Sequence, residues 1–311
     1  MARLQRPLVA IDWGTSALRG ARLDPDGAVL EERHFPRGIT TVEPGGFRAV
    51  FDACFADWMT APDTLGLIAG MAGSRQGWQE APYCPCPAGF DELARHLLWI
   101  EPGRLAIVPG LSCRLADGIP DVMRGEEVQI FGALAQAGRR DALVVLPGTH
   151  SKWARVRDGR VTGFRTAMTG EFYALLSRQS LLARTLDADA PFDPTAFDEG
   201  VRRALDGAGL LHSAFGVRTR ALFAERDPGA LASHLSGLLI GEELRAFAPG
   251  ESDHRAAGSA LLLVGAEALT RRYARAFGVL GWTCAVAPAD AGWRGLRALA
   301  ARDQPLLASG G

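Results

Sequence analysis

The sequence lacks most of the signals that mark specialised classes of protein. Its 311 residues include only five cysteines, and the C-P-C at residues 84–86 does not have the C-x-x-C spacing of zinc or redox sites. No apolar run approaches the 18 residues of a membrane-spanning helix, and no signal-peptide pattern follows the short apolar stretch near the N-terminus. We therefore expect free thiols in a reducing cytoplasm and no membrane partner.

An excess of charge of either sign is also lacking. The net charge of −1 gives no electrostatic footprint for nucleic acid, so we expect no nucleic-acid partner. With 48% hydrophobic and 22% charged residues, the chain reads as an ordinary globular protein, and its length allows two domains. The oligomeric state is left open, a homodimer included.

Several familiar catalytic motifs are missing as well. There is no G-x-x-x-x-G-K-[ST], no G-x-G-x-x-G after a strand and no G-x-S-x-G elbow. What is present is an apolar strand, residues 8–11, that ends in Asp12 and is followed by a Gly-Thr-Ser turn at 14–16. A hairpin explains the glycine and serine of this turn, but it requires no aspartate.

The same pattern occurs twice. LVAIDWGTSALRGARLDPDGAV at 8–29 and LVVLPGTHSKWARVRDGRV at 143–161 each contain an apolar strand, a Gly-Thr turn with a following serine, a second strand and an Asp-Gly turn. The two copies begin about one domain length apart. We therefore predict two similar α/β domains, residues 1–138 and 139–311, each opening with a meander of strands.

Hydrophobic periodicity predicts the other elements. Whether the terminal helix packs on the first domain is left open, and the Gly- and Pro-rich residues 72–89 are expected to have no regular structure. The expected helices cover residues 46–60, 90–98, 126–138, 170–186, 268–280 and 292–302, with a helix-rich region at 195–250. The expected strands cover residues 65–71, 105–108, 142–146, 260–264 and 284–287.

Both Gly-Thr turns offer backbone N–H groups and hydroxyls with little bulk, which suits them to bind phosphate. Two such turns on two domains could hold one polyphosphate. Asp12 would then position Mg²⁺, mainly through the ion's water ligands. This role explains why an aspartate ends the first strand.

These residues resemble the sugar kinase/actin/heat-shock ATPase superfamily. DWGTS at 12–16 and PGTHSK at 147–152 stand where that superfamily carries its two phosphate motifs. The resemblance implies two ribonuclease-H-like domains with mixed five-stranded sheets flanked by helices, and an ATP cleft between the domains. LLLVGAEAL is similar to the adenosine motif, with Gly265 as the matching glycine and Ala266 in place of the second.

At closer range the chain resembles the 2-dehydro-3-deoxygalactonate kinase family. The stretches that carry this likeness cover most of the chain: DWGTS, GSRQGWQEAPYCPCPAG, MRGEE, LPGTHSKW, TAMTGEFYALLS and LSGLLIGEEL. The resemblance implies transfer of the γ-phosphoryl group of ATP to the 6-hydroxyl of a six-carbon keto-deoxy sugar acid in galactonate catabolism. ATP and Mg²⁺ are the implied cofactors.

The resemblance also implies roles for single residues. Glu126, at the start of the helix before the second turn, is the expected catalytic base, although Glu127 shares this position and the superfamily has aspartate there. Asp12 is the second expected catalytic residue. The expected nucleotide contacts are Gly14, Thr15, Ser16, Gly148, Thr149, Ser151, Lys152 and Gly265.

The substrate carries a carboxylate, which a guanidinium binds well. Arg75, beside Ser74, is the first candidate for this contact, with Trp78 as a wall for the carbon chain and Arg124 in reserve. Glu171, opening a helix, is expected to bond sugar hydroxyls.

Three alternatives remain. The first is a kinase for another sugar acid or a hexose. The second is a non-catalytic, nucleotide-dependent switch or sugar sensor with the same fold. The third is an ATP-driven dehydratase activator, which would need cysteines for an iron–sulfur cluster that Cys84 and Cys86 alone do not supply.

Overall fold

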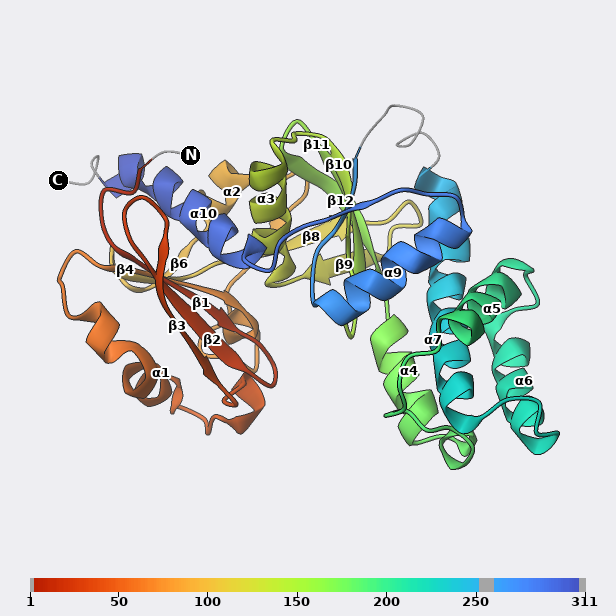
Figure 1. The fold of residues 1–311 in the computed structure, drawn as a ribbon. Helices are drawn as coiled ribbons and strands as arrows, with labels where there is room; N and C mark the ends of the chain where they lie inside the picture. Colours follow the sequence, from red (N-terminus) through yellow and green to blue (C-terminus); the bar gives the residue numbers. More distant parts are fainter. Residues whose placement is uncertain (1–2, 252–259, 308–311) are drawn as a thin grey trace. The chain divides into compact units, whose positions relative to one another are not determined.

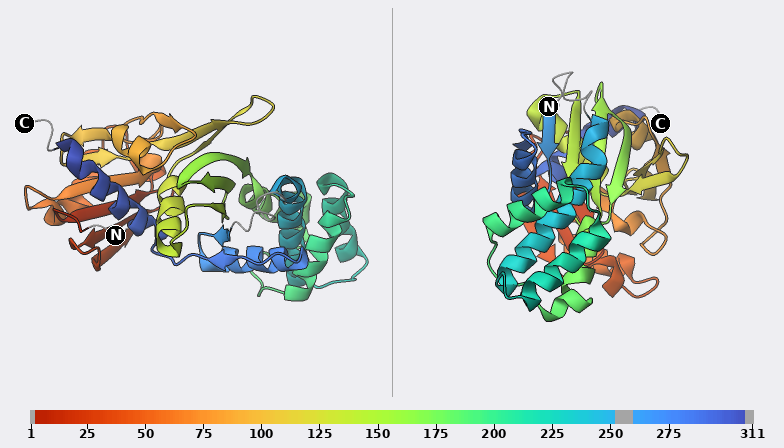
Figure 2. Two further views of the ribbon diagram at one scale, coloured as in Figure 1. Left: turned by 90° about the horizontal axis from the view of Figure 1, so that it is seen from above. Right: turned by 90° about the vertical axis from the view of Figure 1, so that its right-hand side faces the viewer.

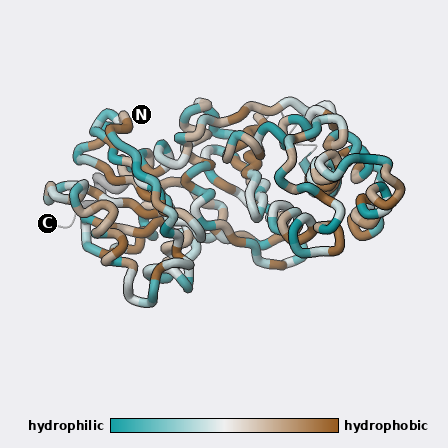
Figure 3. Tube along the Cα trace, turned by 60° about the horizontal axis from the view of Figure 1, so that its bottom comes forward, coloured by the Kyte–Doolittle hydropathy of each residue, from teal (hydrophilic) through white to brown (hydrophobic). Residues whose placement is uncertain are grey.

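A computed structural model describes residues 3–251 and 260–307 (Figure 1). The chain divides into two compact units. Unit 1 contains residues 1–141, 154–165 and 287–311, and unit 2 contains residues 142–153 and 166–286. Along the tube in Figure 3, brown apolar segments alternate with teal hydrophilic ones, as expected for elements that bury one face.

The first sheet has the strand order β3-β2-β1-β4-β7-β6. Its first three strands form the predicted antiparallel meander, and β4 runs parallel to both β1 and β7. Nearly every residue of β1 and β4 is buried, because the central strands of such a sheet are covered on both faces. The strands are β1 (Leu8–Trp13), β2 (Leu18–Leu23), β3 (Val29–Phe35), β4 (Leu65–Gly70), β6 (Leu98–Glu101) and β7 (Leu105–Ile107).

The second sheet repeats this topology in the order β12-β11-β10-β13-β14. Here too the fourth strand in the order, β13, runs parallel to the first strand of the meander and to the strand beyond it. The predicted α/β repeat is thus confirmed, although the first sheet has a sixth strand, β6, where five were expected. The strands are β10 (Ala142–Leu146), β11 (Ser151–Arg157), β12 (Arg160–Ala167), β13 (Ala260–Leu263) and β14 (Ala285–Val286).

A small third sheet was not predicted. It consists of β5 (Tyr83–Pro85), β8 (Gly110–Arg114) and β9 (Pro120–Met123), in the order β5-β8-β9. The expectation that residues 72–89 lack regular structure is therefore wrong for β5. Pairing with β8 orders this Pro-rich segment, and the preceding glycines and prolines give no sign of it.

The C-terminal helix α10 (Ala291–Leu307) belongs to unit 1, where it lies against α3 (Glu126–Ala137) and α2 (Phe90–Arg95) (Figure 1). A Cβ atom added to Gly132 would lie 1.8 Å from the Ala291 carbonyl oxygen, and one on Gly295 would lie 1.8 Å from that of Val128. Glycine at both positions lets the two backbones touch. The expected second domain, 139–311, therefore needs correction, since its last helix packs on the first.

Unit 2 is rich in helices, as predicted for 195–250 (Figure 2). The long helix α7 packs backbone to backbone on α5, because a Cβ atom on Gly237 would lie 2.0 Å from the Phe197 carbonyl oxygen. Within the described ranges, no helix is long and apolar enough to cross a membrane. The helices are α4 (Thr169–Arg178), α5 (Pro194–Leu205), α6 (Leu210–Leu222), α7 (Pro228–Phe247) and α9 (Glu267–Val279), while α1 (Phe47–Phe55) covers the first sheet.

Candidate active site

Turn 1, residues 14–17, joins β1 to β2 in unit 1. It is closed by a 2.9 Å hydrogen bond from the Gly14 N–H to the Ala17 carbonyl. The carbonyl oxygens of Gly14 and Thr15 accept hydrogen bonds from the backbone N–H groups at 39–40. The N–H groups of Thr15 and Ser16, which are both exposed, have no hydrogen-bond partner among the residues that the structure describes. The turn thus ties up carbonyls and leaves amide donors for an anion.

Asp12 and the start of α3 converge at Gly70. This glycine ends β4 with φ at +93°, and an added Cβ atom would lie 3.2 Å from Asp12 Oδ1 and 2.9 Å from the Trp13 carbonyl oxygen. Gly125, just before α3, has φ at +99°, and its Cβ atom would lie 3.1 Å from the Gly70 Cα. Because neither glycine has a side chain, the two backbones can approach each other closely. This approach brings Asp12 near the N-terminus of α3.

The Asp12 side chain is 26% exposed and pairs across the hairpin with Arg19. A single carboxylate of this kind suits Mg²⁺, which usually takes one or two carboxylates together with waters and substrate phosphates. No cluster of three or more His, Cys, Asp or Glu side chains that could cage a metal occurs in the described part of the chain. The five cysteines are all free thiols, as predicted.

Glu126 and Glu127 share the first turn of α3 but differ in environment. Glu126 is half-buried, and its Oε2 accepts the Arg124 N–H at 2.9 Å. Glu127 is fully buried, with Oε2 accepting the Gly125 N–H at 2.6 Å and Oε1 unpartnered among the described residues. Burial, reinforced by the charge of Glu126, raises the pKa of Glu127 to about 8. Only Glu126 is therefore accessible to a ligand.

A cavity of about 530 Å³ lies beside the loop at residues 73–78. Arg75 lines it with an 87% exposed side chain, whose only described partner is Glu80, with the Arg75 Nε 3.6 Å from Oε1. Trp78 forms another wall, and its ring packs edge-on against Trp13 with 6.1 Å between centroids. The structure thus places the expected carboxylate ligand and the expected wall in one cavity, next to the strand that carries Asp12.

Arg124 is nine-tenths buried near the same loop. Its Nη2 donates to the Ala81 carbonyl at 2.7 Å, and its guanidinium lies 4.4 Å from the centroid of the Tyr83 ring. Nε and Nη1 have no partner among the described residues, and neither has the buried hydroxyl of Ser74. A Cβ atom on Gly73 would lie 2.7 Å from Arg124 Nη1. Four of the five expected substrate residues, Ser74, Arg75, Trp78 and Arg124, therefore gather around one loop.

Turn 2, residues 147–150, joins β10 to β11 in unit 2 and has the same design. The Thr149 carbonyl accepts the Glu171 N–H at 3.0 Å, and Gly170 packs so closely that its Cβ atom would lie 2.4 Å from the Gly148 carbonyl oxygen. The N–H groups of the last three residues of the turn have no hydrogen-bond partner in the described part of the chain. Turn 2 is therefore a second cluster of available amide donors.

Two expected phosphate ligands after turn 2 face inward instead. Ser151 is fully buried and its hydroxyl donates to Glu243 at 2.8 Å, so the expected contact of this hydroxyl with phosphate is not supported. Lys152 is buried as well, and its ammonium donates to the Thr166 hydroxyl at 2.9 Å. The sequence missed this because the Gly-Thr turn suggests an exposed serine, whereas Ser151 already begins β11.

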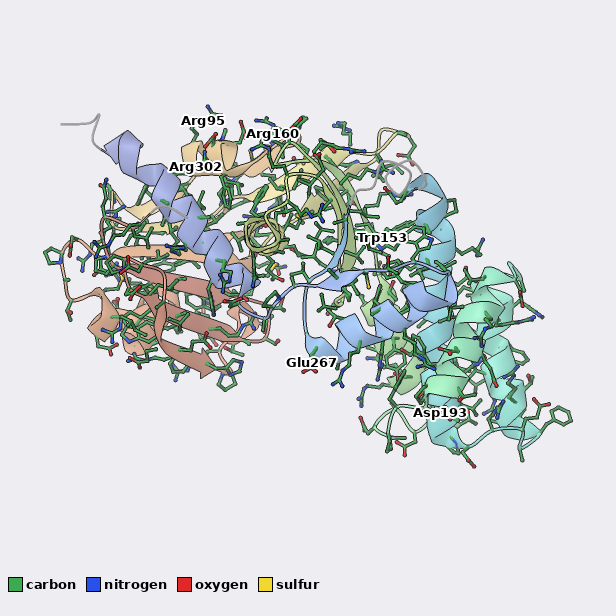
Figure 4. The ribbon with its side chains drawn as sticks, turned by 45° about the horizontal axis from the view of Figure 1, so that its top comes forward. Arg95, Trp153, Arg160, Asp193, Glu267 and Arg302 are labelled. Carbon is green, nitrogen blue, oxygen red and sulfur yellow. The ribbon has the colours of Figure 1, made fainter. Side chains whose placement is uncertain are left out.

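Gly265 lies exposed between β13 and α9, the helix that Glu267 opens in Figure 4. Its φ is +142°, and an added Cβ atom would lie 3.3 Å from the Pro147 carbonyl oxygen. The expected adenosine motif therefore adjoins turn 2. Glu171 also lies at turn 2, where its Oε2 is 2.5 Å from His150 Nε2, and it belongs to unit 2, whereas the other four substrate candidates belong to unit 1.

Sequence reasoning missed the residues that support the two turns. Gly70 lets its own backbone approach that of Trp13, just before turn 1, and Gly170 lets its own backbone approach that of turn 2. An isolated glycine at the end of a strand or the start of a helix is the sequence signal that could have indicated them. Glu243 is a buried acid in the stretch LSGLLIGEEL, and a glutamate that is buried needs hydrogen-bond partners.

Comparison with known proteins identifies the family of the chain. Residues 12–299 match the 2-keto-3-deoxy-galactonokinase family, whose substrate is the same compound that is also called 2-dehydro-3-deoxygalactonate. The 2-dehydro-3-deoxygalactonokinase of Escherichia coli K12 is 34% identical over 94% of this chain and 97% of its own length. A Rhizobium meliloti protein assigned to the same activity is 38% identical over 96% and 97%.

Solved structures give the same result. A crystal structure from Sinorhizobium meliloti, assigned to the same activity, superposes with a TM-score of 0.84 at 37% identity and covers 96% of this chain and 98% of its own. Component A of the (R)-2-hydroxyglutaryl-CoA dehydratase of Acidaminococcus fermentans shares the fold alone, with a TM-score of 0.52 at 12% identity over 96% and 97%. The expected α/β fold with two mixed sheets flanked by helices is confirmed, and the chain belongs to the 2-keto-3-deoxy-galactonokinase family.

Proposed function

We propose that this chain transfers the γ-phosphoryl group of Mg-ATP to the 6-hydroxyl of 2-keto-3-deoxygalactonate. Membership of the family supports a sugar-acid kinase that uses ATP. The observation that carries the residue assignments is the pair of similar turns, each with at least one carbonyl hydrogen-bonded to a neighbouring segment and with its amides available. Phosphoryl transfer depends mainly on positioning and on neutralising charge, and such turns supply both.

For the nucleotide, we assign phosphate contacts to Thr15 and Ser16 of turn 1 and to Gly148 and Thr149 of turn 2. Gly14 shapes the first turn, and Gly265 leaves room for the adenosine beside the second. Asp12 would hold Mg²⁺ through water, and the ion would neutralise charge on the phosphates. Lys152 and Ser151 support the strand after turn 2 in this assignment.

Glu126 is the residue that we assign as the base. It is half-exposed at the N-terminus of α3, close to the backbone position of Asp12, and can accept the proton of the attacking hydroxyl. Glu127, with its pKa raised to about 8, is protonated at neutral pH and adds no second negative charge to the site. The pair therefore separates into one accessible carboxylate and one buried carboxylic acid.

The sugar acid is assigned to the cavity beside Arg75. An exposed ion pair such as Arg75–Glu80 is worth little, so the guanidinium is free to exchange Glu80 for a substrate carboxylate at small cost. Trp78 would pack against the carbon chain, and Ser74 and Arg124 offer buried, unpartnered donors nearby. Glu171 we now place at turn 2, as a brace for His150 and Thr149.

The test is ADP release with Mg-ATP and purified protein. Acceptors should include 2-keto-3-deoxygalactonate, its gluconate epimer, glucose, glycerol and none. Glu126→Gln should abolish release, whereas the matched variant Glu127→Gln should keep most of it. Release only with the galactonate derivative supports the proposal, whereas equal release with every acceptor or none would favour a nucleotide-dependent switch. A cytoplasmic location stays a prediction.

A further inference from the structure

A buried carboxylate with no part in the proposed chemistry lies behind turn 2. Glu243 on α7 is 5% exposed and accepts four hydrogen bonds. Its Oε1 accepts from the Ser151 hydroxyl at 2.8 Å and from Trp153 Nε1 at 2.7 Å, and its Oε2 accepts from the hydroxyls of Tyr273, at 2.7 Å, and Thr169. Figure 4 labels Trp153 at this point of the second sheet.

The donors come from the segments that frame turn 2. Ser151 is the first residue after the turn, and Thr169 is the first residue of α4. The next two residues of α4 contact the turn. Gly170 packs against the Gly148 carbonyl, and the Glu171 N–H donates to the Thr149 carbonyl. Tyr273 lies on α9, the helix that follows Gly265, and Gly265 itself lies beside the Pro147 carbonyl of the turn. One carboxylate thus ties together β11, α4 and α9.

All four groups around this position donate to Glu243, and the Trp153 indole N–H among them can only donate. A carboxylate offers about four lone-pair sites and no donor, which matches four donors. Burial holds the pKa of Glu243 above its ordinary value, although each of the four hydrogen bonds acts to lower it. A glutamine of the same shape would keep one accepting oxygen, but its NH₂ group would face two of these groups, and each of those two hydrogen bonds would have to reverse its direction or break. Such a buried network is rigid when complete and strained when one member fails.

We propose that Glu243 is a positioning residue for ATP, acting through turn 2. It fixes the start of β11 and the start of α4, and thereby fixes the backbone whose N–H groups meet the phosphates. The inference rests on the proposed function, because it takes ATP as the ligand of turn 2.

The test compares Glu243→Gln with the wild-type protein in two measurements. Calorimetric titration with Mg-ATP, without sugar acid, gives Kd, and steady-state kinetics give KM for each substrate. We expect Kd and KM for Mg-ATP to rise on the order of 10- to 100-fold, as for a misplaced binding group. KM for the sugar acid should change less than about twofold, since the assigned sugar-acid residues lie in unit 1.

Leu235→Ala is the matched control. Leu235 is fully buried in the same helix, more than two turns away from Glu243. It belongs to a different hydrophobic cluster from Trp153 and Tyr273, which bind Glu243. It should lower Tm and leave the Kd for Mg-ATP unchanged. Tyr273→Phe, which removes one donor, should raise Kd by a smaller factor than Glu243→Gln.

Three results would overturn the inference. One is a folded Glu243→Gln protein that binds Mg-ATP like the wild type, and another is an equal rise in Kd for Leu235→Ala. If Glu243→Gln does not fold, Thr169→Val takes its place, and an unchanged Kd in that variant is the third. A wild-type protein that does not bind Mg-ATP would instead refute the proposed function itself.

Discussion

Turn 1 and turn 2 have the same backbone design but carry their carboxylates on opposite sides. In turn 1, Asp12 is partly exposed beside the available amides, and the carbonyls are held by the backbone at 39–40. In turn 2, Glu243 is buried behind the turn and surrounded by donors, and the Thr149 carbonyl accepts a hydrogen bond from α4. We therefore assign the exposed carboxylate of Asp12 to the chemistry and the buried carboxylate of Glu243 to positioning.

Asp12→Asn should have the largest effect and should distinguish the two carboxylates. If Asp12 holds Mg²⁺ as we propose, removing its charge should lower kcat on the order of 10³-fold, within the usual range for electrostatic transition-state contacts. Kd for Mg-ATP should change less than it does in Glu243→Gln. Kinetics at saturating Mg-ATP and sugar acid measure this difference. Equal changes in kcat and in the Kd for Mg-ATP in the two variants would show that Asp12 and Glu243 do not have separate roles.

Gly70→Ala should disturb the support of turn 1. Its φ of +93° is strained for alanine, and the new Cβ atom would lie 2.9 Å from the Trp13 carbonyl oxygen. We expect a loss of about 2–4 kcal/mol in the free energy of unfolding, together with a loss of activity. Urea unfolding measures the change in the free energy of unfolding.

Gly138→Ala is its control, because Gly138 has φ at +60° and open space around it. It should cost only about 1 kcal/mol and leave activity unchanged. If the two variants lose equal stability, the close approach at Gly70 contributes nothing.

Glu127→Gln should reveal the neutral acid behind Glu126. The folded-state pKa, about 8, lies above the ordinary 4.5, so the folded protein binds this proton more tightly than the unfolded chain. The stability that Glu127 contributes is complete below about pH 4.5 and is lost as the pH rises through about 8, by a few kcal/mol. The variant should therefore gain stability relative to wild type between pH 5 and 8, measured by urea unfolding. A difference in the free energy of unfolding that does not change with pH would mean that Glu127 is charged in the folded protein.

Arg75→Ala should have the smallest effect on the protein and a selective effect on the substrate. Since its side chain is 87% exposed, stability should not change measurably. KM for the sugar acid should rise about tenfold, the cost of about one charge-assisted hydrogen bond, while KM for Mg-ATP stays constant. An unchanged KM for the sugar acid would move the carboxylate contact to Arg124 or elsewhere.

The sequence was most informative where apolar runs end in glycine. It predicted β10 to the residue, and it predicted the start of α3 at Glu126, because Gly125 and Gly138 mark the two ends of that helix. It also predicted both turns from their repeated pattern. These features depend on local chemistry, which one short segment contains.

What the sequence did not reveal depends on contacts between distant segments. The pattern of α10 shows that one face is buried but not that the face meets α3, and β5 is ordered only by its pairing with β8. The burial of Ser151 follows from its bond to Glu243, 92 residues away. The choice between Glu126 and Glu127 needed their burial, which neighbouring positions on a helix do not determine.

The most direct test of the account is ³¹P NMR of the reaction mixture with Mg-ATP and 2-keto-3-deoxygalactonate. The account predicts a new phosphomonoester signal coupled to the protons on C6, growing as ADP appears, and its absence in Glu126→Gln. Formation of inorganic phosphate alone, at the same rate with and without the sugar acid, would contradict it.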